Sequence, residues 1–269
     1  MSFTERLTVP AGVPVRLADY SSDETGGFAT KRQGRSALKN VTQLLDELQY
    51  RLYAENKRAL LIVLQGMDAS GKDGTIRRVM RGVNPQGTSV TSFKKPSAEE
   101  RDHDFLWRIH KAMPRLGDIG IFNRSHYEDV LVVRVHDIVP RDVWMGRYDQ
   151  INAFEKNLSE NGIVVLKFFL HISKDEQKRR LQDRLDDPTR HWKISPADFA
   201  ERPHWDAYTE AFEDVLSRCS TPWAPWYVIP ADKKWFRDLA VGSVIVEKLQ
   251  SLAMEFPAPS FDVSQITID

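Results

Sequence analysis

The chain lacks three features that would each point to a class of protein. It has a single cysteine, Cys219, so no disulfide can form within the chain, and this suits a reducing compartment. Its 38 lysines and arginines equal its 38 aspartates and glutamates, so no overall charge attracts nucleic acid or a membrane surface. The N-terminus has no apolar core of signal-peptide length, and no apolar run approaches the roughly 18 residues that span a bilayer. We therefore expect a cytoplasmic protein without nucleic-acid or membrane partners, in which any anion site is local.

The most informative stretch is ALLIVLQGMDASGKD, residues 59–73. Residues 60–64 are apolar on both alternating faces, which is typical of a strand buried on both sides of a parallel sheet. The sequence then fits the G-x-x-x-x-G-K phosphate loop and continues into a predicted helix. Glycines let backbone amides turn toward a phosphate, while the helix N-terminus and the lysine add positive charge. The predicted phosphate ligands of this loop are Gly66, Ala69, Ser70, Gly71, Lys72 and Asp73.

The loop departs from the usual pattern in its carboxylates. Where Ser or Thr ordinarily follows the lysine to hold Mg²⁺, this chain has Asp73, and it carries Asp68 inside the loop. Mg²⁺ prefers oxygen ligands and needs only one or two carboxylates besides substrate phosphates. We therefore predict a site for Mg²⁺, with Mn²⁺ as the alternative ion, on Asp68. Asp73 is either a further ligand or a first-turn carboxylate that interacts favourably with the helix dipole.

A second polar cluster follows the apolar strand predicted at residues 119–122. Asn123 and Arg124 come first, and Glu128 and Asp129 lie one helical turn further on. In phosphate-loop enzymes the neighbouring strand delivers a carboxylate toward Mg²⁺, so Asp129 is predicted as a second metal ligand, with Glu128 as the alternative. Open α/β sheets bind ligands at the carboxyl ends of their strands, so we expect Arg124 and Glu128 in the site.

Further cations point to a phosphate-rich ligand. Lys94 and Lys95 follow a short predicted strand at its carboxyl end. A later helix carries Arg180 and Arg184 one turn apart, and Lys193 follows a proline break. A cationic helix before a polar, proline-containing excursion is typical of a mobile lid over a polyphosphate, here at about 178–205. The alternative is a surface helix whose arginines pair with nearby aspartates.

The remaining pattern divides the chain into an arm and a body. Residues 1–33 contain proline and glycine without sustained periodicity, which predicts an extended arm packed on the body or partly loose. Residues 34–269 are predicted to form the domain proper. Leucines and a valine recur at helical spacing between residues 35 and 55, as in a helix that faces a core or a subunit interface.

Four ordered blocks of the sequence resemble one family. They are GMDASGKDGTIR at 66–77, FNRSHYEDVLVVRV at 122–135, FFLHISKDEQKRRLQDRLDDPTRHWK at 168–193 and APWYVIPADKKWFR at 224–237. Together they resemble the polyphosphate kinase 2 family in its short single-domain form, over roughly residues 30–255. The motif HYED at 126–129, which contains Glu128, resembles that of the branch described as class III, which accepts nucleoside monophosphates and diphosphates.

The resemblance implies a fold, a reaction and a set of site residues. The fold is a three-layer α/β P-loop kinase with a mostly parallel central sheet flanked by helices and a helical lid. The reaction is a reversible, Mg²⁺-dependent transfer of the terminal phosphoryl group of inorganic polyphosphate to AMP or ADP, with GMP and GDP as further acceptors. The family commonly forms tetramers or dimers, which implies a homo-oligomer. The implied catalytic residues are Asp68, Lys72, Arg124, Glu128 and Arg180, with Arg134 and Arg184 among the phosphate-binding candidates.

Two other functions remain open at the level of sequence. An ATP-dependent nucleoside monophosphate kinase would use the same fold and would not need polyphosphate. A non-catalytic module that binds nucleotide or polyphosphate would bind without turnover. The phosphate-loop lysine together with nearby carboxylates favours a phosphotransferase, because phosphoryl transfer requires positioning and charge neutralisation from these residue types.

Overall fold

The structure is a computed structural model that describes residues 2–268, and a parallel five-stranded sheet forms its centre. The strands lie in the order β2-β3-β1-β4-β5, and every neighbouring pair is parallel. Their bounds are β1 Ala59–Gln65, β2 Thr88–Ser92, β3 Ile119–Asn123, β4 Ile163–His171 and β5 Trp226–Pro230. The predicted α/β fold with a parallel sheet is confirmed.

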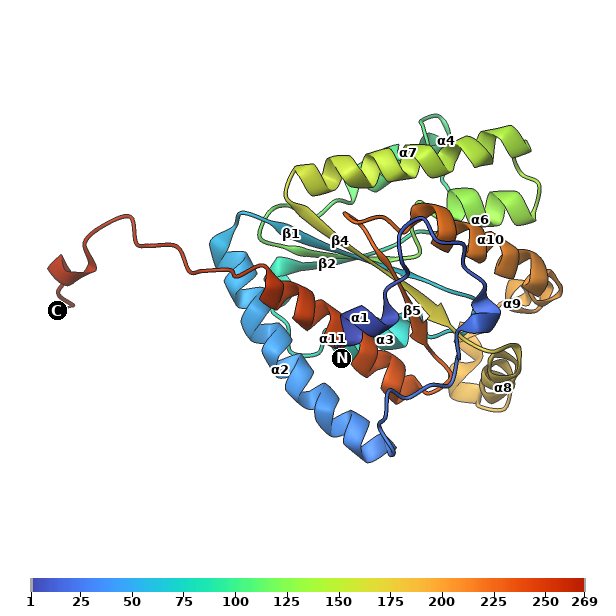
Figure 1. Ribbon diagram of the computed structural model, residues 1–269, viewed down its shortest axis with the longest axis horizontal. Coiled ribbons are helices and arrows are strands. Elements are labelled where there is room, and N and C mark those ends of the chain that lie inside the picture. Colours follow the sequence, from blue (N-terminus) through green and yellow to red (C-terminus); the bar gives the residue numbers. More distant parts are fainter. Residues whose placement is uncertain (1, 269) are drawn as a thin grey trace.

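Helices cover both faces of the sheet, as Figure 1 shows. One layer contains α2, α3 and α11, and the other contains α6, α7 and α10. The helices are α1 Phe3–Leu7, α2 Lys31–Glu55, α3 Lys72–Val79, α4 Ala98–Arg101, α5 Trp107–Lys111, α6 Glu128–Val135, α7 Arg141–Glu160, α8 Lys174–Leu185, α9 Pro196–Ala200, α10 Trp205–Cys219 and α11 Lys234–Ser251. Short 3-10 turns are η1 Leu17–Asp19, η2 Pro85–Gly87, η3 Pro188–Lys193, η4 Arg202–His204 and η5 Val263–Gln265.

The central strand β1 explains why the phosphate loop has a fixed position. All seven of its residues are buried, because helices cover both sides of the strand and strands flank both edges. Its register places Leu64 opposite Asn123 of β3 and opposite Phe168 of β4. The segments that follow β1 and β3 therefore emerge side by side at the carboxyl edge of the sheet, which is where ligands bind in open α/β folds.

The N-terminal arm packs on the body and contains a helical turn. Residues 3–7 form α1, whose first two amides bind the carboxylate of Glu247 on α11. Val9 then donates to the carbonyl of Trp226 on β5, and Leu17 donates to Glu213 on α10. Helix α2 begins at Lys31, inside the range assigned to the arm, and its Leu45, Leu48 and Leu52 are buried in the core of the domain. The C-terminal segment leaves the body after α11 (Figure 1).

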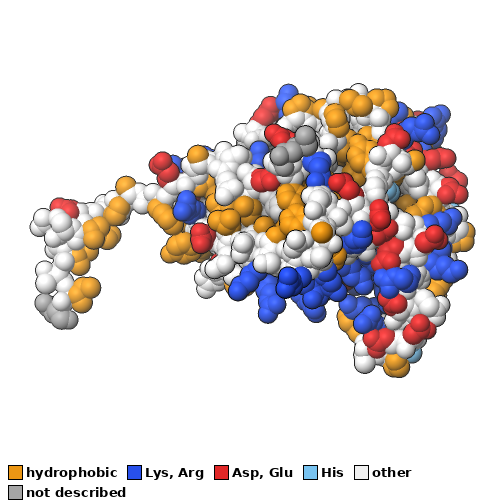
Figure 2. Space-filling model, turned by 60° about the horizontal axis from the view of Figure 1, so that its bottom comes forward, with side chains coloured by type: hydrophobic (Ala, Val, Ile, Leu, Met, Phe, Trp, Pro, Cys, Tyr) orange, Lys and Arg blue, Asp and Glu red, His pale blue; other side chains and the backbone are white. Residues whose placement is uncertain are grey.

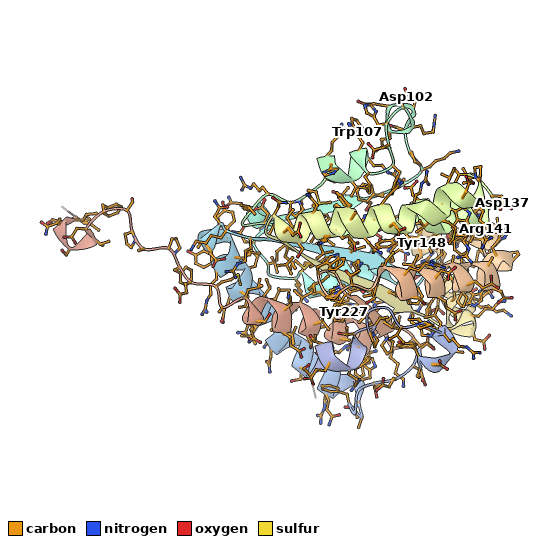
Figure 3. The ribbon with its side chains drawn as sticks, turned by 45° about the horizontal axis from the view of Figure 1, so that its top comes forward. Asp102, Trp107, Asp137, Arg141, Tyr148 and Tyr227 are labelled. Atoms are coloured by element: carbon orange, nitrogen blue, oxygen red, sulfur yellow. The ribbon has the colours of Figure 1, made fainter. Side chains whose placement is uncertain are left out.

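The segment after β2 forms two short helices. Ser97 and Glu100 make a capping box at the start of α4, which ends at Arg101, and α5 starts at Trp107. Asp104 accepts a hydrogen bond from the amide of Leu106 in the turn that separates the two helices. Figure 3 shows Asp102 and Trp107 on the part of the molecule that rises beyond α7. Within residues 2–268, none of the helices has the length and apolar character required to cross a membrane.

Candidate active site

The phosphate loop has the backbone that its glycines predict. Gly66 and Gly71 have positive φ angles of 148° and 105°, and Ala69 has a φ of 60°. A Cβ at Gly66 would lie 2.8 Å from the carbonyl oxygen of Leu170, and one at Gly71 would overlap the guanidinium of Arg237. Both positions therefore require glycine for close packing as well as for φ. Helix α3 starts at Lys72, so its N-terminus faces the loop.

Two buried arginines from later segments hold this loop by its carbonyl oxygens. Arg237 of α11 donates to the carbonyl of Ser70 at 2.8 Å, and Arg180 of α8 donates to the same carbonyl at 2.9 Å. Arg180 also reaches the carbonyl of Ala69 at 3.0 Å. Their side chains are 1% and 5% exposed, so water does not compete for these hydrogen bonds. The hydrogen bonds from Arg180 and Arg237 thus hold the conformation of the loop without any ligand.

Lys72 lies inside the loop with its amine on backbone oxygens. Its Nζ donates to the carbonyl of Gly66 at 2.8 Å and lies 3.4 Å from that of Met67. Burial lowers the pKa of Lys72, and the positive charge of Arg124 lowers it further, whereas Asp68 and Glu128 act in the opposite direction. A phosphate would give this amine an anionic partner in place of two neutral carbonyls.

The turn after β3 brings the second predicted cluster to the loop. Arg124 has a φ of 63°, and its guanidinium binds Asp68 at 3.0 Å and Glu128 at 3.4 Å. The pKa of Arg124 is raised: burial alone would lower it, but Glu128 and Asp68 outweigh that effect. Asn123 donates to Asp73 at 2.7 Å. The sequence predicted these residues in one site, and the structure brings them together from elements far apart in the chain.

Three consecutive buried residues fix this turn to the body. Ser125, His126 and Tyr127 are fully buried, while the flanking Arg124 and Glu128 reach the cavity. Ser125 accepts from Gln65 of β1 at 3.1 Å, and Tyr127 donates to Glu155 of α7 at 2.9 Å. We call the residues that hold the turn the anchor network, and its members are Gln65, Ser125, His126, Tyr127, Glu155 and Lys167.

A buried ion pair completes the anchor network. Lys167 of β4 binds Glu155, and both side chains are fully buried. Lys167 also donates to the hydroxyl of Tyr127 at 2.8 Å and to the carbonyl of Cys219 at 2.6 Å, so its three donors are all used. Burial alone raises the pKa of Glu155, but Lys167 and His126 outweigh it, and the net pKa is lowered. Each member of the pair is therefore buried with a partner of opposite sign.

A cavity of about 290 Å³ opens beside the loop. One wall consists of Asp68, Arg124 and Glu128, and another wall comes from the predicted lid, including Ser195, Asp198 and Arg202. Its floor is apolar and aromatic and consists of Leu131, Val132, Trp205, Tyr208 and Phe212. The cavity thus combines a charged rim for phosphate with an apolar surface for a flat ring.

Several predicted residues lie outside this cavity. Asp129 faces Arg147 and Arg108, at 3.5 Å and 3.7 Å, because successive residues on a helix point about 100° apart. Arg134 pairs with Asp214 of α10 and lies over the ring of Trp144. Arg180 uses its guanidinium on backbone carbonyls and Glu176, so the structure places it behind the loop. Glu128, the alternative to Asp129, is the carboxylate of α6 that lines the cavity.

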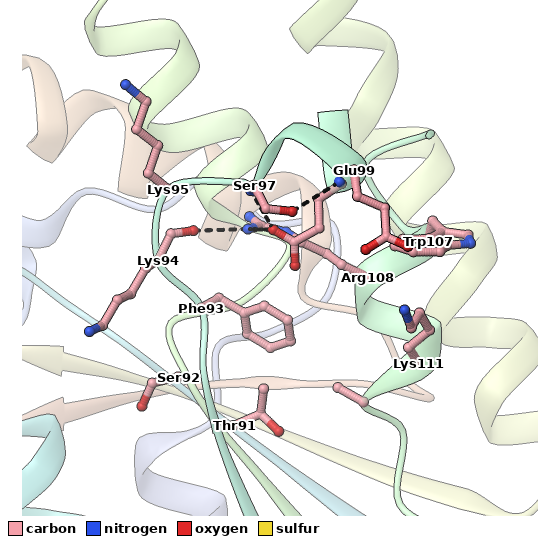
Figure 4. Close-up of a pocket in the computed structure, with 12 residues that line it drawn as sticks. Thr91, Ser92, Phe93, Lys94, Lys95, Ser97, Glu99, Trp107, Arg108 and Lys111 are labelled. Carbon is pink, nitrogen blue, oxygen red and sulfur yellow. Dashed lines mark hydrogen bonds and ion pairs between the residues drawn. The ribbon is translucent and has the colours of Figure 1, made fainter. Parts of the chain in front are cut away.

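The other predicted cations occupy two separate places. Lys94 and Lys95 line a different cavity of about 470 Å³, together with Trp107, Arg108 and Lys111 (Figure 4). Arg108 donates to the carbonyl of Lys94 at 2.8 Å and thereby fixes the chain at this point. Arg184 lies 3.6 Å from Asp198 inside the predicted lid, and Lys193 lies over the ring of Trp192 on the surface. These cations do not line the cavity beside the loop.

Comparison with known proteins identifies the family. The family model described as polyphosphate kinase 2 matches residues 29–257. The chain belongs to the polyphosphate kinase 2 family. It is 50% identical to an AMP/ADP-polyphosphate phosphotransferase of Meiothermus ruber, over 94% of this chain and 95% of that protein. It is 44% identical to an ADP-polyphosphate phosphotransferase of Rhodopseudomonas palustris, over 94% and 92%.

A solved structure supports the same conclusion. The crystal structure of polyphosphate kinase 2 from Arthrobacter aurescens TC1 superposes with a TM-score of 0.95 at 43% sequence identity, covering 98% of this chain and 94% of that one. The protein is therefore a kinase of the polyphosphate kinase 2 family with the P-loop kinase fold.

The site of this kinase fits a hard divalent cation. Asp68 and Glu128 both lie against Arg124 at the rim of the cavity, and both offer only oxygen donors. Residues 2–268 contain no group of three or more His, Cys, Asp or Glu side chains poised to bind metal. Mg²⁺ does not need one, because water and substrate phosphates supply most of its ligands. Asp68 and Glu128 are the residues that would hold such an ion.

The sequence reasoning missed the residues that support the kinase site from behind. Arg237, Glu155 and Lys167 were not singled out, because each lies in a stretch that looks like ordinary helix or strand. Lys167 was the easiest of the three to recognise from sequence, because it is the one charged residue in the apolar run IVVLKFFL at 163–170. A buried lysine needs an anionic partner, and that signal would have pointed to a buried acid.

Proposed function

We propose that this kinase transfers the terminal phosphoryl group of inorganic polyphosphate to nucleoside monophosphates and diphosphates. The proposal is supported by the names of its two full-length relatives, which act on AMP, ADP and polyphosphate. The observation that carries it is the convergence of Arg124, Asp68 and Glu128 at the rim of one cavity, next to Lys72, whose amine binds the carbonyl of Gly66. Donor and acceptor are both polyanions, so their approach requires concentrated positive charge at the point of transfer.

Each residue has a role that follows from its position. The loop amides, the α3 N-terminus and Lys72 bind the phosphate that is nearest the loop. Arg124 stands between the two carboxylates and is placed to neutralise charge on the transferred group. Asp68 and Glu128 would hold Mg²⁺, with Mn²⁺ as the alternative ion, and the ion would neutralise charge on the phosphates. The buried arginines behind the loop keep this arrangement fixed before substrate arrives.

The apolar floor of the cavity suits the nucleoside. Trp205, Tyr208 and Phe212 offer aromatic surface that suits the flat face of a purine ring. Such packing does not distinguish the hydrogen-bonding groups at the edge of adenine from those of guanine. We therefore propose AMP and ADP as acceptors, with GMP and GDP as further acceptors. Because phosphates of similar energy lie on both sides of the reaction, we also propose that it runs in both directions.

One assay tests the proposal directly. The protein is incubated with Mg²⁺ and polyphosphate and with AMP, ADP, GMP or GDP in turn, and the nucleotides are then separated by anion-exchange chromatography. We expect polyphosphate-dependent formation of the next higher phosphate, abolished by a chelator and restored by Mg²⁺. Phosphorylation of AMP by ATP with no effect of polyphosphate would instead support a nucleoside monophosphate kinase. Full binding without turnover would support a binding module.

Two further proposals concern assembly and closure. We propose that the protein forms a homo-oligomer, a dimer or a tetramer, and light scattering in solution measures its mass directly. We also propose that part of residues 178–205 moves as a lid. Protection of backbone amides from hydrogen exchange in this segment should rise when nucleotide and polyphosphate are both present. An unchanged exchange rate in the segment would count against a lid.

A further inference from the structure

A local excess of positive charge lies on α2 and α3 although the whole chain is neutral. The first part of α2, residues 31–45, contains Lys31, Arg32, Arg35 and Lys39 and no acidic residue. The segment 72–81 at α3 contains four cations and one acid, Asp73, which accepts a hydrogen bond from Asn123. Positive charge is therefore concentrated in the first part of α2 and in the α3 segment.

Helical geometry places the α2 cations on the side of that helix that faces α3 and β2. Gln49 and Tyr53 follow Lys31 and Arg35 by about five full turns, so each pair lies on one line along the helix. Gln49 and Tyr53 pack against Gly87, in the turn between α3 and β2: a Cβ placed at Gly87 would overlap the side chain of Gln49 and would lie 2.9 Å from Tyr53. Lys31 and Arg35 therefore lie on the same side of α2 as this contact.

Both helices pack against α11. A Cβ placed at Gly242 of α11 would lie 2.8 Å from Val41 and 3.7 Å from Leu38 on α2, and 3.6 Å from Val79 on α3. The exposed cations next to these positions, Lys39 on α2 and Arg81 after α3, thus belong to one surface. We call Lys31, Arg35, Lys39, Arg77 and Arg81 the cationic surface.

The cationic surface has no internal neutralisation. All five side chains belong to exposed residues, and among residues 2–268 none of them forms an ion pair within 4.0 Å. Half of the other exposed arginines do have such a partner, for example Arg179 and Arg190 in the predicted lid. Figure 2 shows a band of Lys and Arg side chains, with few acidic ones among them, on the face turned forward there. Unpaired like charges on one face repel each other, and a bound polyanion would relieve that repulsion.

The surface leads to the catalytic loop. Helix α3 begins at Lys72, which lies in that loop, and Arg77 follows on the exposed side of the helix. At about 1.5 Å rise per residue Arg77 lies roughly 7.5 Å along the helix from Lys72. Arg81 is exposed in the turn after the helix ends. Arg35 and Lys39 on α2 extend the same surface further from the loop.

We propose that the cationic surface binds the part of a long polyphosphate chain that lies outside the active site. The inference rests on the proposed function, which makes polyphosphate the donor, and it adds a second place where that donor is held. Polyphosphate fits better than a single-stranded nucleic acid, because residues 31–45 and 72–81 contain no aromatic residue on which a base could stack. A polyphosphate chain is a repeat of identical charged units, so cations spaced along a surface are sufficient to bind it.

The test uses the two cations farthest from the loop. In the variant Arg35→Gln/Lys39→Gln, the dissociation constant of long-chain polyphosphate is measured by calorimetry between low and high salt. We expect affinity about tenfold weaker at low salt, and a slope of log Kd against log salt that is smaller by about 1.4 for two lost contacts. The matched control is Lys57→Gln/Lys248→Gln, at the opposite, amino edge of the sheet, which should bind as the unchanged protein does.

A short donor separates this inference from the proposed function. We expect tripolyphosphate to occupy the loop and not α2, so its binding and its use as a donor should be unchanged in the α2 variant. The inference would be overturned if the α2 variant bound long-chain polyphosphate with the affinity and the salt dependence of the unchanged protein. Equal binding of an oligothymidylate of matched charge would overturn the choice of polyphosphate. If no donor phosphorylates any nucleotide while the α2 variant still loses long-chain affinity, the proposed function fails and the binding surface stands.

Discussion

The two walls of the cavity are held in opposite ways. The body wall, with the phosphate loop and the turn after β3, is fixed by buried charged side chains such as Arg237 and Lys167. The wall from the predicted lid consists of short helical turns with exposed residues. Its ion pair between Arg184 and Asp198 is long and partly exposed. Buried, fully satisfied hydrogen bonds specify one geometry, whereas exposed pairs contribute little and exchange easily.

The boundary between the two walls runs through α8. The first half of α8 belongs to the body, because Gln177 donates to the carbonyl of Asp68 at 3.0 Å and Arg180 is buried behind the loop. Gln177 also accepts from Arg202 at 2.7 Å, so it connects the two walls. The range predicted as a lid thus includes residues that the structure fixes to the phosphate loop. Any closing motion should be confined to the segment after Leu185.

Breaking the buried ion pair should have the largest effect on the body wall. Lys167→Met leaves Glu155 buried without its cation, so we expect the free energy of unfolding to fall by about 3–5 kcal/mol. Urea denaturation followed by circular dichroism measures this. The double variant Lys167→Met/Glu155→Leu removes both charges and should recover most of the loss. Equal destabilisation in the single and double variants would show that packing, and not the unpaired charge, decides stability here.

Removing the cation of the body wall should reduce turnover while the fold remains. Arg124→Ala should lower kcat about 10²–10³-fold, because it removes charge stabilisation of the transferred group. Arg134→Ala is the matched control on the same segment, since Arg134 pairs with Asp214 outside the cavity. We expect the control to keep kcat within a few-fold. Similar losses in both variants would remove the special role of Arg124.

The pH dependence of turnover should report the electrostatics of the same wall. Lys72 is cationic below its pKa and neutral above it, so activity falls as pH rises through that pKa. Burial and Arg124 lower the pKa of Lys72, so the alkaline decline should begin at lower pH than for an ordinary lysine. In Arg124→Gln the residual activity should decline at higher pH than in the unchanged protein, because the positive neighbour is gone. A decline at the same pH in both proteins would assign it to another group.

The corresponding change in the lid wall should have the smallest effect. Asp198→Asn removes the charge of the partly exposed partner of Arg184, and we expect the free energy of unfolding to change by less than about 1 kcal/mol. Thermal and urea unfolding under the conditions used for Lys167→Met give the comparison. A loss as large as that of the body-wall variant would contradict the distinction between the two walls.

The sequence predicted what lies in contiguous motifs. The loop, its flanking strand and helix, and the membership of Arg124 and Glu128 in one site follow from local spacing, and the structure has them together. The direction of a side chain was not predictable where it depends on packing between distant elements. Arg180 looked like a lid arginine, yet α8 packs so that this residue lies behind the loop. Asp129 and Glu128 are adjacent in sequence, and only the placement of α5 and α7 shows which one faces the cavity.

The central claim is that Lys72 and Arg124 on the body wall bind the phosphates that exchange a phosphoryl group. A crystal structure of the protein with nucleotide, polyphosphate and Mg²⁺ tests it most directly. We expect the Nζ of Lys72 to leave the carbonyl of Gly66 and lie about 2.7–3.0 Å from a phosphate oxygen, with the Arg124 guanidinium on the same ligand. A bound ligand with both side chains still on their present protein partners, and no phosphate oxygen within reach, would contradict the account.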